Sequence, residues 1–406
     1  MIRLKEKRNN LNDIYQNLGV TRIINAAGTL TRLGGPPMAV EAVQAMQEAS
    51  RWSVRIEELQ ERAGAYLAEV TGAEAGYVTS GASAGLQLAA AACIAGLDIR
   101  KMECLPDTSG MPNEIIVQRS HRNGYDHALR SAGAALVEVG HLGNPTGGYL
   151  APWHIEAAIH TNTVAVHWVV MDVPGVVSLK DTINVAHRYH LPVIVDAAAA
   201  LPPAENLEYF IGEGADLVVF SGGKAICGPQ ASGILVGQRD LIESVALQHQ
   251  DMDVLSETWT LRDKFLESNK LLGPPSQGIG RALKVGKEEI AGLVAALRTY
   301  VNQNHSAWNQ EQNRKIQVLK SGLRQLPGLE VESFKSREAT YPKLRVAIKE
   351  QAGITVADMV LRLLDGDPAV AVGQEGLLQG YLIVDPVSLG VDQLEIVIRR
   401  FSAVLS

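Results

Sequence analysis

The sequence has few cysteines and no long apolar run, and each shortage excludes a class of protein. Its three cysteines, Cys93, Cys104 and Cys227, form no CxxC or Cys/His pattern, which argues against a disulfide framework and against a zinc site. No uninterrupted run of about 18 apolar residues is present, and the charged first 19 residues lack the apolar core of a secretory signal. We therefore expect a cytoplasmic protein that binds no metal.

The sequence also lacks an excess of basic residues. Its 37 lysines and arginines are outnumbered by 44 aspartates and glutamates, which gives a formal net charge of -7 and a pI near 5.8. This balance provides no overall attraction for a phosphate backbone or an anionic membrane, so we expect neither nucleic acid nor membrane as a partner. A hydrophobic content of 46% over 406 residues is enough for a large core and more than one domain.

Between residues 60 and 236, short apolar runs alternate with longer helical patterns, as in the βαβ units of a mainly parallel sheet. The expected strands are 76–79, 114–118, 135–139, 164–170, 192–196, 216–220 and 232–236, and the expected helices are 83–95, 122–132 and 180–190. The predicted fold class is therefore α/β, with seven strands in one sheet and helices on both faces.

The pattern changes after residue 240, where helices dominate. We expect helices at 281–303, 307–326, 355–364 and 391–404, and strands at 343–348, 368–372 and 380–384. This order is typical of a smaller α+β domain. The predicted division is an N-terminal segment (1–60), a large α/β domain (61–270) and a C-terminal α+β domain (271–406).

Two charged residues follow apolar strands at a distance that suits a shared site. Asp196 ends the run Pro-Val-Ile-Val-Asp, and Lys224 follows the run ending Phe-Ser-Gly-Gly, 224 − 196 = 28 residues later. Ligands of open α/β sheets bind beyond the carboxyl ends of the strands. A carboxylate beside a pyridine nitrogen and a lysine that forms a Schiff base are what pyridoxal phosphate (PLP) requires. Taken alone, Asp196 also fits a helix N-cap and Lys224 a surface turn.

A phosphate-binding cup is predicted where the strand at 76–79 runs through small residues into an Ala-rich helix. The free N–H groups and the positive end of the helix dipole attract a phosphate there, and Gly81, Ala82 and Ser83 are the candidate contacts. Ser221 is a further candidate, through its hydroxyl group. Ordinary close packing between a strand and a helix explains the small residues equally well.

A polar cluster follows the strand at 114–118. His121 is predicted to contact the cofactor ring or to carry protons, and Arg122 to bind a carboxylate or phosphate of the substrate. A histidine that merely begins a helix is the alternative interpretation of His121.

Taken together, the segments TGAEAGYVTSGASAGL, HRNGYDHALRSAGA, VIVDAAAALPP, DLVVFSGGKAICGPQ and GRALKVGKEEIAGLVAAL resemble the selenocysteine-synthase-like branch of fold-type-I PLP enzymes. Within that branch they resemble most the D-glucosaminate-6-phosphate ammonia-lyases. The resemblance covers residues from about 20 to at least 300. It implies a PLP transferase fold with Lys224 as the Schiff-base lysine, Asp196 as the partner of the ring nitrogen, and a homodimer or higher homo-oligomer with shared active sites. It also implies that Gly280 reaches the cofactor phosphate of a neighbouring subunit.

The reaction predicted from this resemblance is α,β-elimination on a small β-hydroxy amino acid or amino-sugar acid, giving a 2-oxo acid and ammonia. Lys224 is expected to take the α-proton of the substrate. The same fold and cofactor also support transamination, aldol cleavage and racemisation, so an aminotransferase, aldolase or racemase stays open. A non-catalytic PLP-binding protein is a further alternative.

Overall fold

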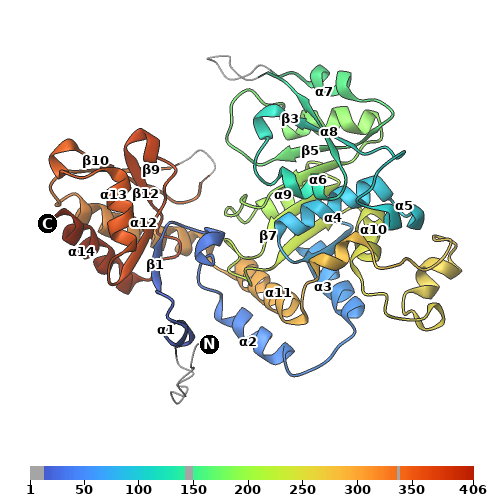
Figure 1. Cartoon of the computed structure of the whole chain (residues 1–406), viewed down its shortest axis with the longest axis horizontal. Coiled ribbons are helices and arrows are strands. Elements are labelled where there is room, and N and C mark those ends of the chain that lie inside the picture. Colours follow the sequence, from blue (N-terminus) through green and yellow to red (C-terminus); the bar gives the residue numbers. More distant parts are fainter. Residues whose placement is uncertain (1–12, 142–149, 336–338) are drawn as a thin grey trace, which may run out of the picture. The chain divides into compact units, whose positions relative to one another are not determined.

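The computed structural model describes residues 13–141, 150–335 and 339–406, and these fall into two compact units (Figure 1). The larger unit comprises residues 38–303, and the smaller one combines the segment before residue 38 with residues 304–406. The smaller unit is discontinuous in sequence because β1 (Ile23–Ala26) pairs in parallel with β11 (Ala369–Val372).

The units divide the chain at other positions than the three predicted segments. The predicted boundary at 270/271 lies inside the larger unit, which continues to residue 303 because α11 (Lys287–Asn302) packs against α2 (Val40–Ala49) and α3 (Ile56–Thr71). The first 60 residues are shared between the two units.

The larger unit is built on a seven-stranded sheet with the order β2-β8-β7-β6-β5-β3-β4. Its strands are β2 (Ala75–Thr79), β3 (Glu114–Gln118), β4 (Ala135–Val139), β5 (Thr163–Val169), β6 (Val193–Asp196), β7 (Leu217–Ser221) and β8 (Gly233–Gly237). β8 is antiparallel to both of its neighbours, and β3 to β7 pair in parallel. The prediction of a mainly parallel seven-stranded α/β sheet is confirmed, and each predicted strand end lies within one residue of the observed one.

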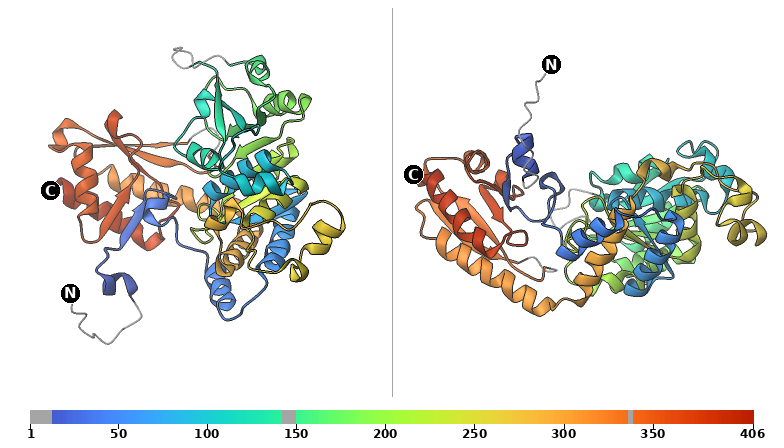
Figure 2. Two further views of the ribbon diagram at one scale, coloured as in Figure 1. Left: turned by 45° about the vertical axis from the view of Figure 1, so that its right-hand side comes forward. Right: turned by 90° about the horizontal axis from the view of Figure 1, so that it is seen from below.

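Helices cover both faces of this sheet (Figure 2). One face packs against α4 (Ala82–Ala95), α5 (Ile99–Cys104), α6 (Asp126–Ser131) and α10 (Arg239–His249). The other packs against α3, α7 (Pro152–Ala158), α8 (Leu179–Arg188), α9 (Asn206–Gly212) and α11.

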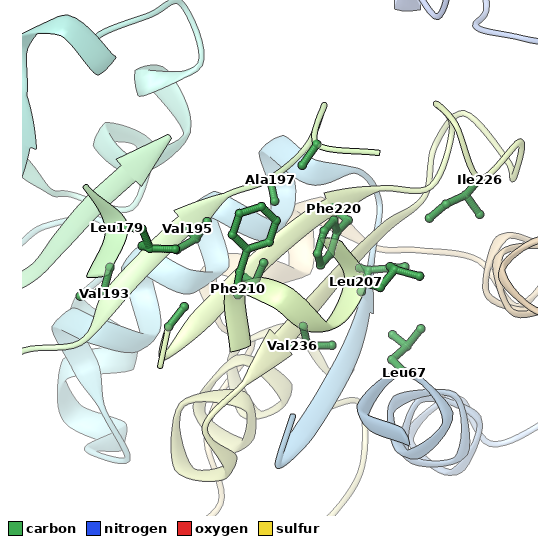
Figure 3. Close-up of a cluster of buried hydrophobic side chains, with 14 of the residues drawn as sticks. Leu67, Leu179, Val193, Val195, Ala197, Leu207, Phe210, Phe220, Ile226 and Val236 are labelled. Carbon is green, nitrogen blue, oxygen red and sulfur yellow. The ribbon is translucent and has the colours of Figure 1, made fainter. Parts of the chain in front are cut away.

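Successive side chains of each strand point to opposite faces of the sheet, so each strand contributes to the cores on both faces. In β7, Leu217 and Val219 belong to the core beneath α4, whereas Val218 and Phe220 belong to the opposite core. Figure 3 shows part of this second core, with Phe220 in it. Because each buried apolar side chain of this size contributes about 1.5–3 kcal/mol, a strand buried on both faces holds its carboxyl end firmly in place. The groups that follow β6 and β7 therefore start from rigid positions.

Three predicted helices begin at least three residues later in the structure than the sequence pattern indicates, one of them being the helix predicted at 391–404, which begins at Leu394 after a short 3₁₀ turn. The helix predicted at 122–132 begins only at Asp126, since Asn123 forms a turn in which its side chain donates to the His121 carbonyl (3.1 Å). The helix predicted at 281–303 begins at Lys287, after a short 3₁₀ turn, Ile279–Leu283.

The smaller unit contains the two-stranded sheet β1–β11 and a three-stranded antiparallel sheet with the order β12-β10-β9. Its remaining elements are α1 (Ile14–Leu18), α12 (His305–Leu323), β9 (Leu329–Phe334), β10 (Lys343–Ile348), α13 (Val356–Leu364), β12 (Tyr381–Val384) and α14 (Leu394–Leu405). Helices α12, α13 and α14 share one core with the apolar sides of the strands. None of the described helices in either unit is long and apolar enough to cross a membrane.

Candidate active site

Asp196 occupies the carboxyl end of β6, between the ends of β5 and β7. It pairs with Val169 on β5 and with Val219 on β7, and only 8% of it is exposed. Its Oδ1 accepts a hydrogen bond from the Ala198 amide at 3.0 Å, and its carbonyl accepts one from Val170 N. The backbone of the following turn therefore fixes the orientation of this buried carboxylate.

Lys224 stands in a tight turn that follows β7. The Gly222 amide donates to the Ser232 carbonyl (3.0 Å), and the Gly228 amide donates to the Gly222 carbonyl (2.9 Å). A Cβ on Gly222 would lie 2.2 Å from Ser232 Oγ, so the turn requires glycine there. These bonds hold the backbone of the lysine at the end of the sheet.

Two opposing effects act on the pKa of Lys224. Burial lowers the pKa of Lys224 below its ordinary value, and the negative charge of Asp196 opposes this by raising it. A buried amine with a lowered pKa is the kind that forms imines and later takes up protons. The structure thus brings together the two residues that the sequence singled out.

The predicted phosphate cup lies at the start of α4. Gly81 precedes the helix at φ 141°, and no side chain caps the helix N-terminus. A Cβ on Gly85 would lie 3.0 Å from Val219 Cγ1, so the first turn of α4 packs directly on β7. The uncapped N–H groups near Ala82 and Ser83 are therefore close to the strand that leads to Ser221 and Lys224.

His121 is fully buried after β3, in the 3₁₀ turn Arg119–His121. Its Nδ1 accepts from the Val169 amide at 3.3 Å, and its ring meets that of Trp168 edge to face at 5.2 Å. Burial, with a smaller effect of His167, lowers the pKa of His121 to about 4. Its Nε2 has no hydrogen-bond partner among the described residues. One nitrogen of this ring is thus fixed by the backbone of β5, and the other is buried.

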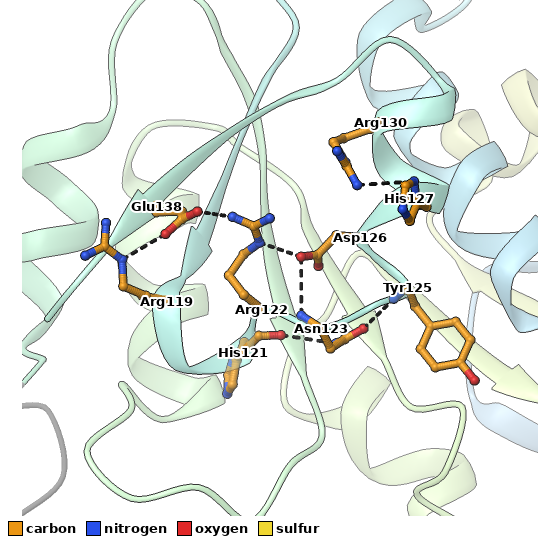
Figure 4. Close-up of polar contacts among 9 residues, drawn as sticks. All are labelled: Arg119, His121, Arg122, Asn123, Tyr125, Asp126, His127, Arg130 and Glu138. Carbon is orange, nitrogen blue, oxygen red and sulfur yellow. Dashed lines mark hydrogen bonds and ion pairs between the residues drawn. The ribbon is translucent and has the colours of Figure 1, made fainter. Parts of the chain in front are cut away.

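Arg122 is engaged by two carboxylates. Its guanidinium forms ion pairs with Asp126, at the start of α6, and with Glu138 on β4, and Arg119 also contacts Glu138 at 2.8 Å (Figure 4). The Nε and Nη1 atoms of Arg122 are therefore both engaged by carboxylates of the protein itself. The predicted contact of Arg122 with a substrate anion stays a prediction.

Gly280 is buried against α4 and α10. A Cβ there would lie 2.7 Å from Leu88 Cδ2 and 2.8 Å from the Gln248 carbonyl. The predicted contact of Gly280 with a neighbouring subunit remains a prediction.

A cavity of about 600 Å³ lies elsewhere in the larger unit, among α3, β2, α10 and the segment around Trp259 and Phe265. Of the described residues that line it, none is a predicted site residue. Across the described ranges no cluster of three or more His, Cys, Asp or Glu is arranged to hold a metal, and Cys93, Cys104 and Cys227 are free thiols.

Sequence reasoning missed His167, which lies on β5 beside the site. It is only 2% exposed, and its pKa is lowered by burial and raised by the charges of Asp196 and Asp126. In the sequence it stands inside the apolar run Val-Ala-Val-His-Trp-Val-Val. The only sign in the sequence that His167 has a special role is that a histidine interrupts an apolar run typical of a strand buried on both faces.

A family model described as aminotransferase class-V matches residues 41–376. Among curated proteins, the D-glucosaminate-6-phosphate ammonia lyase of Salmonella typhimurium is 32% identical over 398 residues, which are 96% of each chain. A 5'-C-glycyluridine monooxygenase-decarboxylase from a Streptomyces species is 31% identical, over 96% of this chain and 92% of that protein. An L-seryl-tRNA(Sec) selenium transferase of Aquifex aeolicus is 25% identical, over 82% of this chain and 74% of that protein.

Solved structures show the same relationships. A structure of D-glucosaminate-6-phosphate ammonia-lyase is similar with a TM-score of 0.81 and 31% identity, over 97% of this chain and 98% of that one. The cysteine desulfurase CsdA of Escherichia coli shares the fold, with a TM-score of 0.56 and 19% identity over 90% and 91% of the two chains.

Proposed function

Because the chain belongs to the aminotransferase class-V family, we propose that it is a PLP-dependent lyase that eliminates ammonia from a small β-hydroxy amino acid or amino-sugar acid. The resemblance to the selenocysteine-synthase-like branch is confirmed by its relatives. One observation carries the choice of reaction: the ammonia lyase is similar over nearly the whole length of both chains, in sequence and in structure.

The residues at the ends of β6 and β7 fit PLP. A half-buried lysine with a lowered pKa suits the covalent attachment, and the buried Asp196 suits a protonated ring nitrogen. The uncapped start of α4 suits the phosphate, with Gly81, Ala82, Ser83 and Ser221 as contacts. His121 Nε2, buried without a described partner, is available to the ring. When bound, PLP supplies an electron sink for the pair of electrons left when the α-proton departs.

Lys224 handles the proton in this proposal. With PLP bound, Lys224 would hold it covalently, and the lysine amine, whose pKa burial lowers, would be the base that removes the α-proton of the substrate. The β-hydroxyl then leaves as water. A water molecule later adds where the nitrogen is released, so the net products are one 2-oxo acid and one ammonia.

The proposed partner of the protein is itself. We expect a homodimer or higher homo-oligomer with shared active sites, located in the cytoplasm, with a small amino acid or amino-sugar acid as substrate. The apolar side chains of Trp52, Leu255 and Leu272 are at least 66% exposed on this single copy, and exposed apolar side chains of this size support association.

A second candidate is oxidative decarboxylation. The Streptomyces relative, named as a monooxygenase-decarboxylase, is 31% identical over 96% of this chain, nearly as similar as the lyase. Oxygen consumption and carbon dioxide release would mark this activity, whereas elimination requires neither.

The test supplies PLP-loaded protein with D-glucosaminate 6-phosphate and a panel of D- and L-β-hydroxy amino acids. We expect ammonia and a 2-oxo acid in equal amounts, without oxygen uptake. Lys224→Ala should lose turnover and the visible absorbance of lysine-bound PLP, while Lys180→Ala, at an exposed position of helix α8, should keep both. Turnover that depends on an added 2-oxo acid would replace the lyase by an aminotransferase, and oxygen uptake would favour the second candidate.

A further inference from the structure

His167 and Asp196 project from the same face of the sheet. In the register of β5 and β6, His167 pairs with Ile194 and Val169 pairs with Asp196. Side chains two positions apart on a strand share a face, so the imidazole and the carboxylate are diagonal neighbours. Ile194 belongs to the core beneath α4 and α6, which places both groups under these helices.

Asp126 approaches the same place from above the sheet, because it is the first residue of α6. It is 4% exposed, and one of its oxygens is bound by Arg122. His167 responds electrostatically to both Asp126 and Asp196. A chain of interactions therefore runs from Arg122 through Asp126 and His167 to Asp196, and on to Lys224.

Three buried polar atoms along this chain have no hydrogen-bond partner among the described residues: His121 Nε2, Asp126 Oδ1 and His167 Nδ1. A buried polar atom without a partner costs about 1–3 kcal/mol. Apolar side chains would fill these positions without that cost. Three unpaired polar atoms on one side of the sheet therefore indicate a functional requirement.

We infer that His167 is a positioning residue for the proposed cofactor site: it holds the Asp196 carboxylate in its orientation, with Asp126 and Arg122 anchoring it from the far side. This inference rests on the proposed function, because Asp196 is the group that would face the ring nitrogen. It also gives Arg122 a role other than contact with the substrate, acting through Asp126 and His167.

The imidazole suits this position because two carboxylates, Asp126 and Asp196, lie near enough to act on it electrostatically. Asp126 and Asp196 are 4% and 8% exposed, and electrostatic interactions are strong in a buried region of low polarity. The imidazole also hydrogen-bonds the backbone of Ile194, and its Nδ1, buried without a partner among the described residues, is the polar atom left for a carboxylate. The groups that face it are Asp126 from α6, His121 from the turn after β3, and Asp196 from β6, with Lys224 beyond Asp196.

The test compares His167→Phe, which keeps the ring size but removes both nitrogens, with His167→Asn, whose amide nitrogen replaces Nδ1. PLP affinity and the pH midpoint of the absorbance of bound PLP are measured for each. We expect His167→Phe to weaken PLP binding about tenfold or more, as when groups that orient a ligand-binding residue are removed. It should also move the pH midpoint down, because the ring nitrogen loses its proton more readily beside a weakened carboxylate. His167→Asn should recover most of both effects.

His160→Gln is the matched control, since His160 is half exposed and pairs with Glu114 at 2.7 Å. Unchanged affinity and midpoint in a folded His167→Phe protein would overturn the inference. The ring of His167 is also followed by NMR in cofactor-free protein, where Asp126→Asn and Asp196→Asn should each lower its pKa. If neither substitution changes the pKa of His167, the inferred interaction of His167 with Asp126 and Asp196 is refuted, even if PLP binds. Conversely, if both substitutions lower the pKa of His167 but the protein never binds PLP, only the proposed function is refuted.

Discussion

Asp196 and Lys224 act on one another across the ends of neighbouring strands: burial lowers the pKa of Lys224, and the Asp196 carboxylate raises it. Since the carboxylate stabilises the ammonium form, Asp196→Asn should lower the pKa of Lys224 further. The midpoint for labelling Lys224 with an amine-specific reagent, read by peptide mass spectrometry on cofactor-free protein, should move to lower pH. Lys180 serves as an internal reference whose midpoint stays fixed. An upward shift at Lys224 would contradict this account of the pair.

His121 should make the protein less stable in mild acid. Its pKa is about 4 in the folded protein and about 6.5 in an unfolded chain, so between these values the unfolded chain binds a proton that the folded one excludes. The free energy of unfolding therefore falls as the pH drops from about 6.5 towards 4. Denaturation at pH 7.5 and pH 5 should show a smaller loss for His121→Gln than for wild type. Equal losses in the two proteins would refute this contribution; His160→Gln is the control.

Arg122 should matter for stability even without substrate. Arg122→Ala leaves the Asp126 carboxylate, 4% exposed, without its ion pair. Breaking a buried pair from one side is strongly destabilising, and because Arg122 is itself about a third exposed we expect a reduced loss of about 2 kcal/mol. Glu138→Gln removes only a partly exposed partner and should cost under about 1 kcal/mol. Urea denaturation measures both, and a loss from Glu138→Gln as large as that from Arg122→Ala would contradict the ranking.

Gly222→Ala should disturb the turn that carries Lys224. The added Cβ would lie 2.2 Å from Ser232 Oγ and 2.5 Å from Leu293 Cδ1, and such overpacking costs about 1–3 kcal/mol. Gly212→Ala, at the end of α9, meets no atom within 4 Å and is the matched control. Thermal melts should show a loss for the first substitution and none for the second. Equal melting temperatures would mean that the turn can relax around a methyl group.

The strands and the Asp196–Lys224 pair were predictable because local patterns specify them. Apolar runs bounded by Gly, Pro and polar residues place each strand of the larger sheet within one residue. The rule that parallel strands end at one edge then brings Asp196 and Lys224 together without further information.

Other features depend on partners distant in the sequence. Asp126 follows Arg122 by four residues, a spacing visible in the sequence, but Glu138 belongs to a different strand, and only the fold shows that it binds the same guanidinium. His167 is flanked by apolar residues, so its neighbours Asp126 and Asp196 appear only once α6 and β6 are placed. β1 was missed for the same reason, since four residues carry little signal without β11.

The pairing of β1 with β11 also determines the order in which parts of the chain can fold during synthesis. Between Ala26 and Ala369 lie 369 − 26 − 1 = 342 residues, and at about 5–20 residues per second the ribosome needs roughly 17–70 s to make them. Residues 38–303 have been synthesised before β11 is made. We therefore expect the larger unit to fold while β1 is still without its partner strand. Ribosome-bound chains halted at residue 350 should then resist protease within 38–303 but be cleaved between 20 and 37, and full-length chains should resist in both places.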